Sequence, residues 1–148
     1  MDNFGKPTIT AANSTFFLTV PGLYDSPVKV EGYSTDAMVS GEAITPVVAE
    51  MGVDGHLSVG WTPTAKTITV TLAADSPSRQ IFEDWVAYQD TKREAMLCSA
   101  EFCLPGIGRK YIGIRGVTTS VPPMPGANKT LQPVAYTIQF EKWTPAAI

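Results

Sequence analysis

The sequence is poor in the residues from which most catalytic and metal sites are built. Its 148 residues include one histidine, His56, and two cysteines, Cys98 and Cys103. A Ser-His-Asp or Cys-His site would need that histidine within a motif, and a zinc site needs more nitrogen and sulfur ligands than these three residues supply. His56 follows a glycine at a predicted strand start, where a surface histidine is the simplest interpretation. We therefore expect no enzyme, no bound metal and no cofactor.

An excess of basic charge and a long apolar run are also absent. Lys and Arg number 11 against 14 Asp and Glu, for a net charge of −3. A dedicated nucleic-acid binder usually has a basic excess, so specific DNA binding is not expected. No apolar run approaches the ~20 residues of a membrane span. The first six residues have no apolar segment typical of a secretory signal, so we expect neither membrane association nor export by that route.

One segment combines a strand and a helix. In residues 66–72, Ile68, Val70 and Leu72 alternate with three threonines, which predicts a strand with one apolar face. Ser76 and Pro77 then suit the start of a helix at about residues 77–93. Its apolar residues at helical spacing must pack against a sheet, because no second helix is predicted.

The rest of the chain predicts strands that are apolar on one face. They span residues 15–20, 27–33, 96–104, 109–121 (with a bulge at Gly116) and 131–143. Strands of this kind indicate antiparallel sheets. The expected fold is mainly β (α+β): one domain, residues 1–148, forming an antiparallel β-sandwich or partly open barrel with one flanking helix. Residues 1–13 are expected to form an N-terminal arm and residues 144–148 a C-terminal tail. The predicted core contains Ile81, Phe82, Trp85, Val86, Phe102, Tyr136, Ile138 and Phe140.

The two cysteines are not expected to form a disulfide. Cys98 and Cys103 are five residues apart on one predicted strand, which places them on opposite faces and ~16 Å apart along it. Disulfide Cα atoms must lie within about 7 Å. We expect a buried thiol at Cys98 and a partly exposed one at Cys103.

Residues 34–55 form a long, less regular connection. Pro46 argues against a central strand, and residues 52–55 are typical of a turn. A connection of about 20 residues inside a compact domain is usually functional, although a plain surface excursion is an equal alternative.

Short polar side chains cover the other face of the predicted strands. An ordinary solvent-exposed face would look the same in sequence as the wall of a channel. The residues on this polar face are Thr67, Thr69, Thr71, Ser99, Glu101, Thr137, Gln139 and Glu141.

Several runs give the chain a resemblance to the tail tube proteins of long-tailed bacteriophages. They are TFFLTVPGLY at residues 15–24, VEGYSTDA at 30–37, MGVDGHLS at 51–58, ADSPS with IFEDW at 74–85, and LQPV at 131–134. The resemblance covers nearly the whole chain and rests on the texture and order of these runs rather than on one motif.

This resemblance implies a structural virion protein that assembles itself. Tail tube proteins form hexameric rings that stack into a tube, and the sheets of neighbouring subunits join around a channel that conducts DNA into the host. The tubes of type VI secretion systems and of contractile bacteriocins share this plan. The implied partners are further copies of the chain, with sheath, tape measure and baseplate proteins, in a phage tail assembled in the host cytoplasm.

The resemblance also gives roles to residues. The polar face above becomes the expected channel wall, with Glu101 and Glu141 as its acids. The segment 34–55 becomes the expected contact between rings, through Asp36, Met38, Val39, Ile44, Val47, Val48 and Met51. Two alternatives stay open: a distal or baseplate-proximal ring of the same fold, and an unrelated small-ligand-binding barrel or carboxylate enzyme.

Overall fold

The computed structural model describes residues 14–32 and 39–148, which form one helix and nine strands. The expected N-terminal arm, residues 1–13, lies outside this described part. The helix is α1 (Arg79–Lys92), and a short 3-10 turn, η1, spans Pro105–Ile107. The strands are β1 (Thr15–Val20), β2 (Tyr24–Val30), β3 (Val39–Gly41), β4 (Val47–Met51), β5 (Leu57–Trp61), β6 (Lys66–Leu72), β7 (Cys98–Leu104), β8 (Arg109–Ser120) and β9 (Val134–Ala147).

Seven of these strands form one antiparallel sheet in the order β2-β1-β7-β8-β9-β6-β3. The sheet bends over on itself, because Val39 of the last strand lines the same groove as Phe102 of β7 and Tyr111 of β8. It does not close, since β2 and β3 remain edge strands. The predicted fold class, mainly β with antiparallel sheets and one helix, is confirmed, in its open form rather than as a closed barrel.

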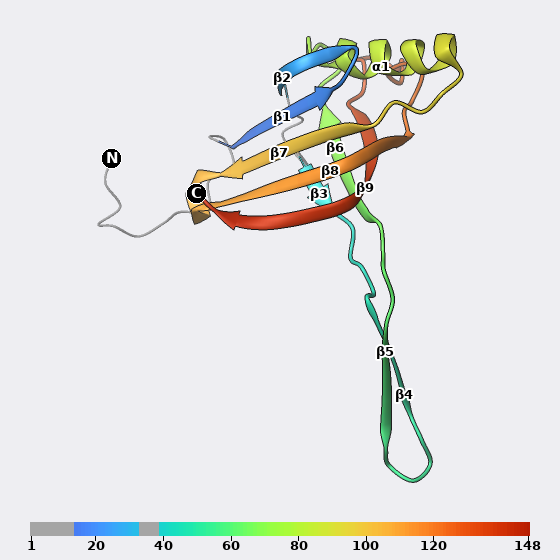
Figure 1. The fold of residues 1–148 in the computed structure, drawn as a ribbon. Coiled ribbons are helices and arrows are strands. Elements are labelled where there is room, and N and C mark those ends of the chain that lie inside the picture. The colour runs from blue at the N-terminus through green and yellow to red at the C-terminus, as the bar shows by residue number, and fades with distance from the viewer. Residues whose placement is uncertain (1–13, 33–38) are drawn as a thin grey trace.

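The core lies inside the bend of the sheet, and α1 covers one end of it (Figure 1). Phe82 stacks on Tyr136 of β9 with ring centroids 4.2 Å apart, and Trp85 is fully buried beside it. Among the predicted core residues, Val86 and Phe102 are half-buried. Val86 lines a hollow beside the helix, and Phe102 lines the groove that it shares with Val39 and Tyr111. The other six, Ile81, Phe82, Trp85, Tyr136, Ile138 and Phe140, are buried.

The start of α1 differs from the prediction. The helix begins at Arg79, not at Pro77, and its N-cap residue is Ser78, whose side chain makes no capping hydrogen bond. The Ser76 hydroxyl instead donates to the Glu31 carbonyl oxygen and accepts the Ser78 N–H at 3.2 Å. Ser78 Oγ accepts the Glu31 N–H at 2.7 Å. The two serines therefore join the end of β2 to the start of the helix, and Ser76 also accepts a backbone N–H there.

Two strands are displaced from their predicted bounds. β2 spans Tyr24–Val30 rather than residues 27–33, with Pro27 on an edge strand where a missing N–H is tolerated. β9 continues to Ala147, which pairs with Arg109. The predicted C-terminal tail, residues 144–148, is therefore mostly strand, held by pairing that no local pattern signals.

The predicted bulge in β8 is confirmed. Cys98 pairs with Gly116 while Ala100 pairs with Gly113, so β8 has one extra residue between these points. Arg115 takes a left-handed conformation there, with φ 51°. Gly116 faces the core, where a Cβ would come within 2.5 Å of the Phe140 ring.

The cysteine prediction is confirmed as well: both thiols are free, with Cys98 buried and Cys103 half-buried. Burial raises the pKa of the Cys98 thiol from its ordinary value of 9.0 to about 12, although a hydrogen bond with the Gly116 backbone lowers it in part. Because the folded pKa lies above the unfolded one, this contribution to stability is complete below pH 9 and is lost as the pH rises towards 12.

We expect the free energy of unfolding to fall by ~2 kcal/mol from this thiol between about pH 8 and 10.5. Urea unfolding at several pH values checks this. Cys98→Ala should flatten the alkaline slope, and Cys103→Ala should leave it unchanged. Burial also raises the pKa of Tyr24 and Tyr136, but these tyrosines are present in all three proteins and cancel in the comparison. Equal slopes in all three would contradict the assignment to Cys98.

In the described ranges, no helix has the length and apolar character needed to cross a membrane.

Candidate assembly surfaces

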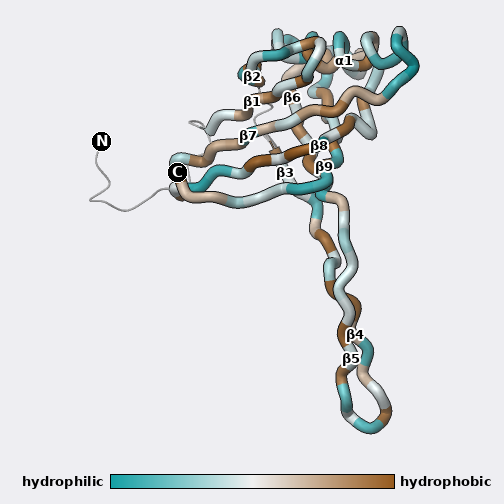
Figure 2. Tube along the Cα trace, in the orientation of Figure 1, coloured by the Kyte–Doolittle hydropathy of each residue, from teal (hydrophilic) through white to brown (hydrophobic). Residues whose placement is uncertain are grey.

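The most exposed apolar surface is a two-stranded ribbon, β4 and β5, that projects away from the sheet (Figure 1). Val47 pairs with Trp61, Ala49 with Val59, and Met51 with Leu57. Paired residues on antiparallel strands share a face, and residues two apart on a strand share it too. One face of the ribbon is therefore wholly apolar. Figure 2 shows brown, hydrophobic segments along the ribbon. This apolar ribbon face consists of Val47, Ala49, Met51, Leu57, Val59 and Trp61.

Nothing in the described part of the chain covers this face. Met51 and Val59 are each 66% exposed and Trp61 is 71% exposed. The opposite face carries Val48, Glu50, Ser58 and Gly60. An isolated hairpin is marginally stable in water, and a contiguous exposed apolar patch marks an interaction site. The ribbon is thus a surface that needs a partner.

The ribbon corrects the prediction for residues 34–55. Within its described part, residues 47–51 form β4, which pairs with β5 as a β-hairpin that continues to Trp61, and the Thr62 N–H closes the base of this hairpin by donating to the Pro46 carbonyl oxygen at 2.8 Å. Val39 belongs to the sheet, paired with Val70, and not to the projecting part. Asp36 and Met38 lie outside the described residues. The remaining four predicted contact residues, Ile44, Val47, Val48 and Met51, are exposed on the projecting segment.

Sequence reasoning placed a strand start at His56 but did not give the bounds of the second strand of the ribbon or pair it with the first. Leu57, Val59 and Trp61 alternate with Ser58 and Gly60 directly after the turn at residues 52–55. That alternation was a usable strand signal, and together with the strand before the turn it predicts a hairpin.

The eight residues of the predicted polar face do come together on one side of the seven-stranded sheet. Thr67 pairs with Gln139 and Thr69 with Thr137. Their chain neighbours Ile68 and Ile138 point into the core, so these four side chains lie on the other side, away from α1. Ser99 and Glu101 alternate in the same way with the buried Cys98 and Ala100 on β7.

Basic residues balance the acids on this face. Glu101 lies 4.0 Å from the Lys110 ammonium, and Glu141 lies 3.1 Å from the Arg115 guanidinium. The bulge at Arg115 puts that side chain on the polar side. All four are exposed enough that each pair contributes little to stability. The acids Glu101 and Glu141 are therefore each paired with a base, a pairing that the sequence did not predict.

A hollow with apolar side chains lies beside α1. It has a volume of about 320 Å³ and is lined by Glu83, Val86, Ala87, Asp90, Val121, Pro122 and Pro123. We call this hollow the helix groove.

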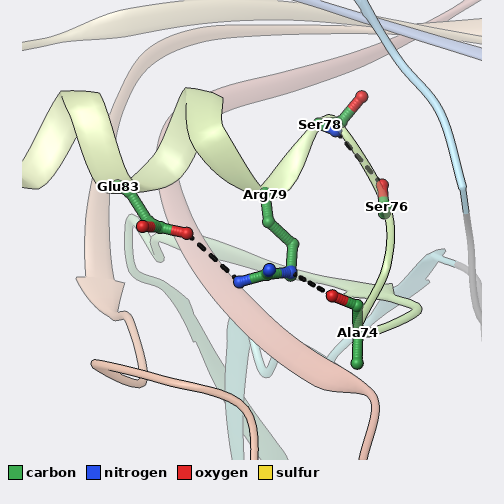
Figure 3. Close-up of polar contacts among 5 residues, drawn as sticks. All are labelled: Ala74, Ser76, Ser78, Arg79 and Glu83. Carbon is green, nitrogen blue, oxygen red and sulfur yellow. Dashed lines mark hydrogen bonds and ion pairs between the residues drawn. The ribbon is translucent and has the colours of Figure 1, made fainter. Parts of the chain in front are cut away.

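The first turn of the helix is fixed by Arg79, whose guanidinium donates to the Ala74 carbonyl oxygen at 2.7 Å and to Glu83 at 3.1 Å (Figure 3). Asp84 accepts a hydrogen bond from the Tyr24 hydroxyl at 2.9 Å.

In the part of the chain that the structure describes, no metal site accompanies these surfaces. Within residues 14–32 and 39–148, no three His, Cys, Asp or Glu side chains are grouped so that they could hold a metal ion. His56 lies at the tip of the ribbon, where its backbone N–H donates to Asp54 at 3.1 Å.

Comparison with known proteins places the chain in a family. The family described as tail fiber protein gp32 matches residues 7–144. No curated protein sequence matches the chain. Among solved structures, the sheath/tube terminator of the extracellular contractile injection system PVC is 13% identical, with a TM-score of 0.61 over 89% of this chain and 93% of that one.

Two further structures are similar over almost the whole chain. The PVC sheath-tube complex gives a TM-score of 0.58 at 14% identity, covering 99% of this chain and 94% of that one. The tube-terminating cap of the anti-feeding prophage gives 0.56 at 13% identity, covering 100% and 95%. At such identities the likeness shows the fold, which this chain shares with components of these contractile injection systems. The chain belongs to the tail fiber protein gp32 family and is a structural tail protein with the tube fold.

Proposed function

We propose that this protein is the ring-forming subunit of a tail tube, that its rings are hexameric, and that they stack through the ribbon. The observation that carries the proposal is the apolar ribbon face. Three cross-strand apolar pairs project from the body with no cover in the described chain. A subunit that functions alone would gain nothing from this exposure, whereas a stacked one buries it.

The open sheet supports ring formation. Its edge strands β2 and β3 present unpaired backbone groups, which invite pairing with another chain. Joining β2 of one copy to β3 of the next would remove both edges around a closed ring. The whole chain, residues 1–148, would then act as a single tube domain.

The polar face is the proposed channel wall. Its threonines, serine and glutamine are short and neutral, and its acids Glu101 and Glu141 are paired with bases. A basic wall would bind phosphates and retard DNA, so a charge-balanced wall suits DNA that passes without specific binding. The phage virion, with assembly in the host cytoplasm, is the proposed location.

Sheath and baseplate proteins are the proposed partners. The similar structures include a sheath-tube complex and a baseplate of contractile injection systems. A tape measure protein inside the tube is the further expected partner.

A second candidate is a terminal ring of the same fold. The tube terminator and the terminating cap are about as similar to this chain as the sheath-tube complex is. A terminal ring would form single rings rather than long stacks. A small-ligand-binding barrel is disfavoured, because the described sheet is open and core side chains fill its interior.

Negative-stain electron microscopy across a concentration series tests the function. We expect stacked rings or tubes with a central hole, and single rings would favour the terminal component. A monomer at every concentration would contradict the ring proposal.

The ribbon variant Val59→Ser/Trp61→Ser should abolish stacking while leaving the monomer folded, because both side chains are exposed and surface changes shift stability by about 0.5 kcal/mol or less. Glu50→Gln on the opposite face is the matched control and should still stack. Unchanged tubes in the double variant would show that the ribbon is not the stacking element.

A further inference from the structure

The ribbon and α1 lie at opposite ends of the molecule (Figure 1), and α1 forms one side of the helix groove. β6 runs from the base of the ribbon at Lys66 to Leu72, just before the helix. Its seven residues span ~23 Å at 3.3 Å per residue. A protruding element at one end and a hollow at the other allow identical copies to contact head to tail. Such a contact between two different surfaces repeats indefinitely when it does not close on itself.

The helix groove has the chemistry to receive an apolar partner. Val86 and Ala87 form its helix side, and Val121, Pro122 and Pro123 form the side made by the loop after β8. The two prolines have no N–H, so this wall offers fewer backbone donors that a partner must satisfy. The same loop carries Met124 and Leu131, which are 63% and 60% exposed.

The carboxylates of the helix groove favour binding of one face of the ribbon over the other. Asp90 lines the helix groove together with Glu83, which is paired with Arg79, and Glu50 lies on the ribbon face opposite the apolar one. Seating that opposite face would bring carboxylates together, which is unfavourable at short range. The apolar ribbon face carries no charge, so it meets the groove while Glu50 points away.

We infer that the helix groove, between α1 and the loop after β8, is the receptor for the apolar ribbon face of the next copy of this chain in the stack. The inference rests on the proposed function, because it names the surface of the next copy to which the stacking ribbon binds. The occupant is a second copy, since the same chain supplies an apolar ribbon at one end and an apolar groove of about 320 Å³ at the other.

Blocking the groove tests the inference. Ala87 is exposed within the groove, so Ala87→Arg should fill it and lower the proportion of stacked rings by about tenfold or more. Gln80→Arg adds the same side chain at another exposed position of α1, outside the groove, and should stack like the wild type. Circular dichroism and the unfolding midpoint show whether both variants remain folded.

Cross-linking gives a second measurement that does not depend on loss of assembly. In a Cys103→Ser background, Val59→Cys with Ala87→Cys should give disulfide-linked ladders of many copies on mild oxidation. Ser58→Cys with Ala87→Cys is the matched control, because Ser58 lies on the other ribbon face, and it should give few links.

The outcomes separate this inference from the proposed function. If the wild type stacks, the ribbon variant does not, and Ala87→Arg still stacks without ladders in the cross-linking pair, the ribbon docks elsewhere and only the inference fails. If the wild type never stacks, both fail together. Loss of stacking in Ala87→Arg, with ladders in the cross-linking pair alone, supports the inference.

Discussion

Replacing Trp85 by alanine is expected to lower the free energy of unfolding by about 3–5 kcal/mol, the usual range for truncating a large buried aromatic side chain. Trp85 is fully buried, and its ring packs 6.3 Å from that of Phe82, centroid to centroid. Its indole N–H donates to the Met96 carbonyl oxygen at 3.0 Å, which ties α1 to the chain entering β7. Truncation removes the packing and this hydrogen bond together.

Urea unfolding, followed by far-UV circular dichroism, measures the loss at Trp85. Trp85→Phe keeps most of the apolar volume but loses the hydrogen bond, so it should be less destabilising than Trp85→Ala. Leu97→Ala provides an exposed control, since Leu97 is 38% exposed, and should change the free energy little. A loss below about 1 kcal/mol for Trp85→Ala would mean that the helix does not seal the core.

The helix and its packing were predictable because the signal is local. Ile81, Phe82 and Trp85 repeat at helical spacing, and a single helix beside one-sided strands has only a sheet to pack against. The polar face was predictable for the same reason, since alternation on each strand assigns its side chains to one face or the other. What alternation cannot supply is which strands are neighbours.

The predictions that failed concern features that depend on long-range strand pairing. No pattern in residues 144–147 predicts a strand, and their extended form comes from pairing with the start of β8. The balance of charge on the polar face was also out of reach. It depends on Arg115 reaching Glu141 across the sheet, from a residue that the bulge turns to that side.

The ribbon was predictable only in part. Its turn and the start of its second strand at His56 were visible in the sequence, but the pairing of the two strands was not predicted. Nothing local indicates that the hairpin leaves the body instead of joining the sheet. That separation is a property of the tertiary structure, and it turns an ordinary hairpin into a candidate assembly surface.

Gly32→Ala is expected to destabilise the fold by roughly 2–5 kcal/mol, because a left-handed L-residue costs about 1–2 kcal/mol and forced overpacking about 1–3 kcal/mol. Gly32 has φ +74°, and a Cβ there would overlap the side chain of Ser76 and lie 3.0 Å from its Cα. The site is stiff, since the Ala73 N–H donates to the Gly32 carbonyl oxygen at 2.8 Å. Relaxation would therefore break the junction between β2 and α1.

Gly108→Ala is the matched control for conformation alone. Gly108 has φ +66° and no atom within 4 Å of an added Cβ, so only the backbone cost should appear, about 1–2 kcal/mol. Repeating Gly32→Ala in a Ser76→Gly background removes the overlapping side chain, so the penalty there should fall towards that of Gly108→Ala. Such a coupling between contacting residues is expected to be about 0.5–3 kcal/mol. Equal losses for Gly32→Ala and Gly108→Ala in the native background would show that the close contact with Ser76 is relieved without cost.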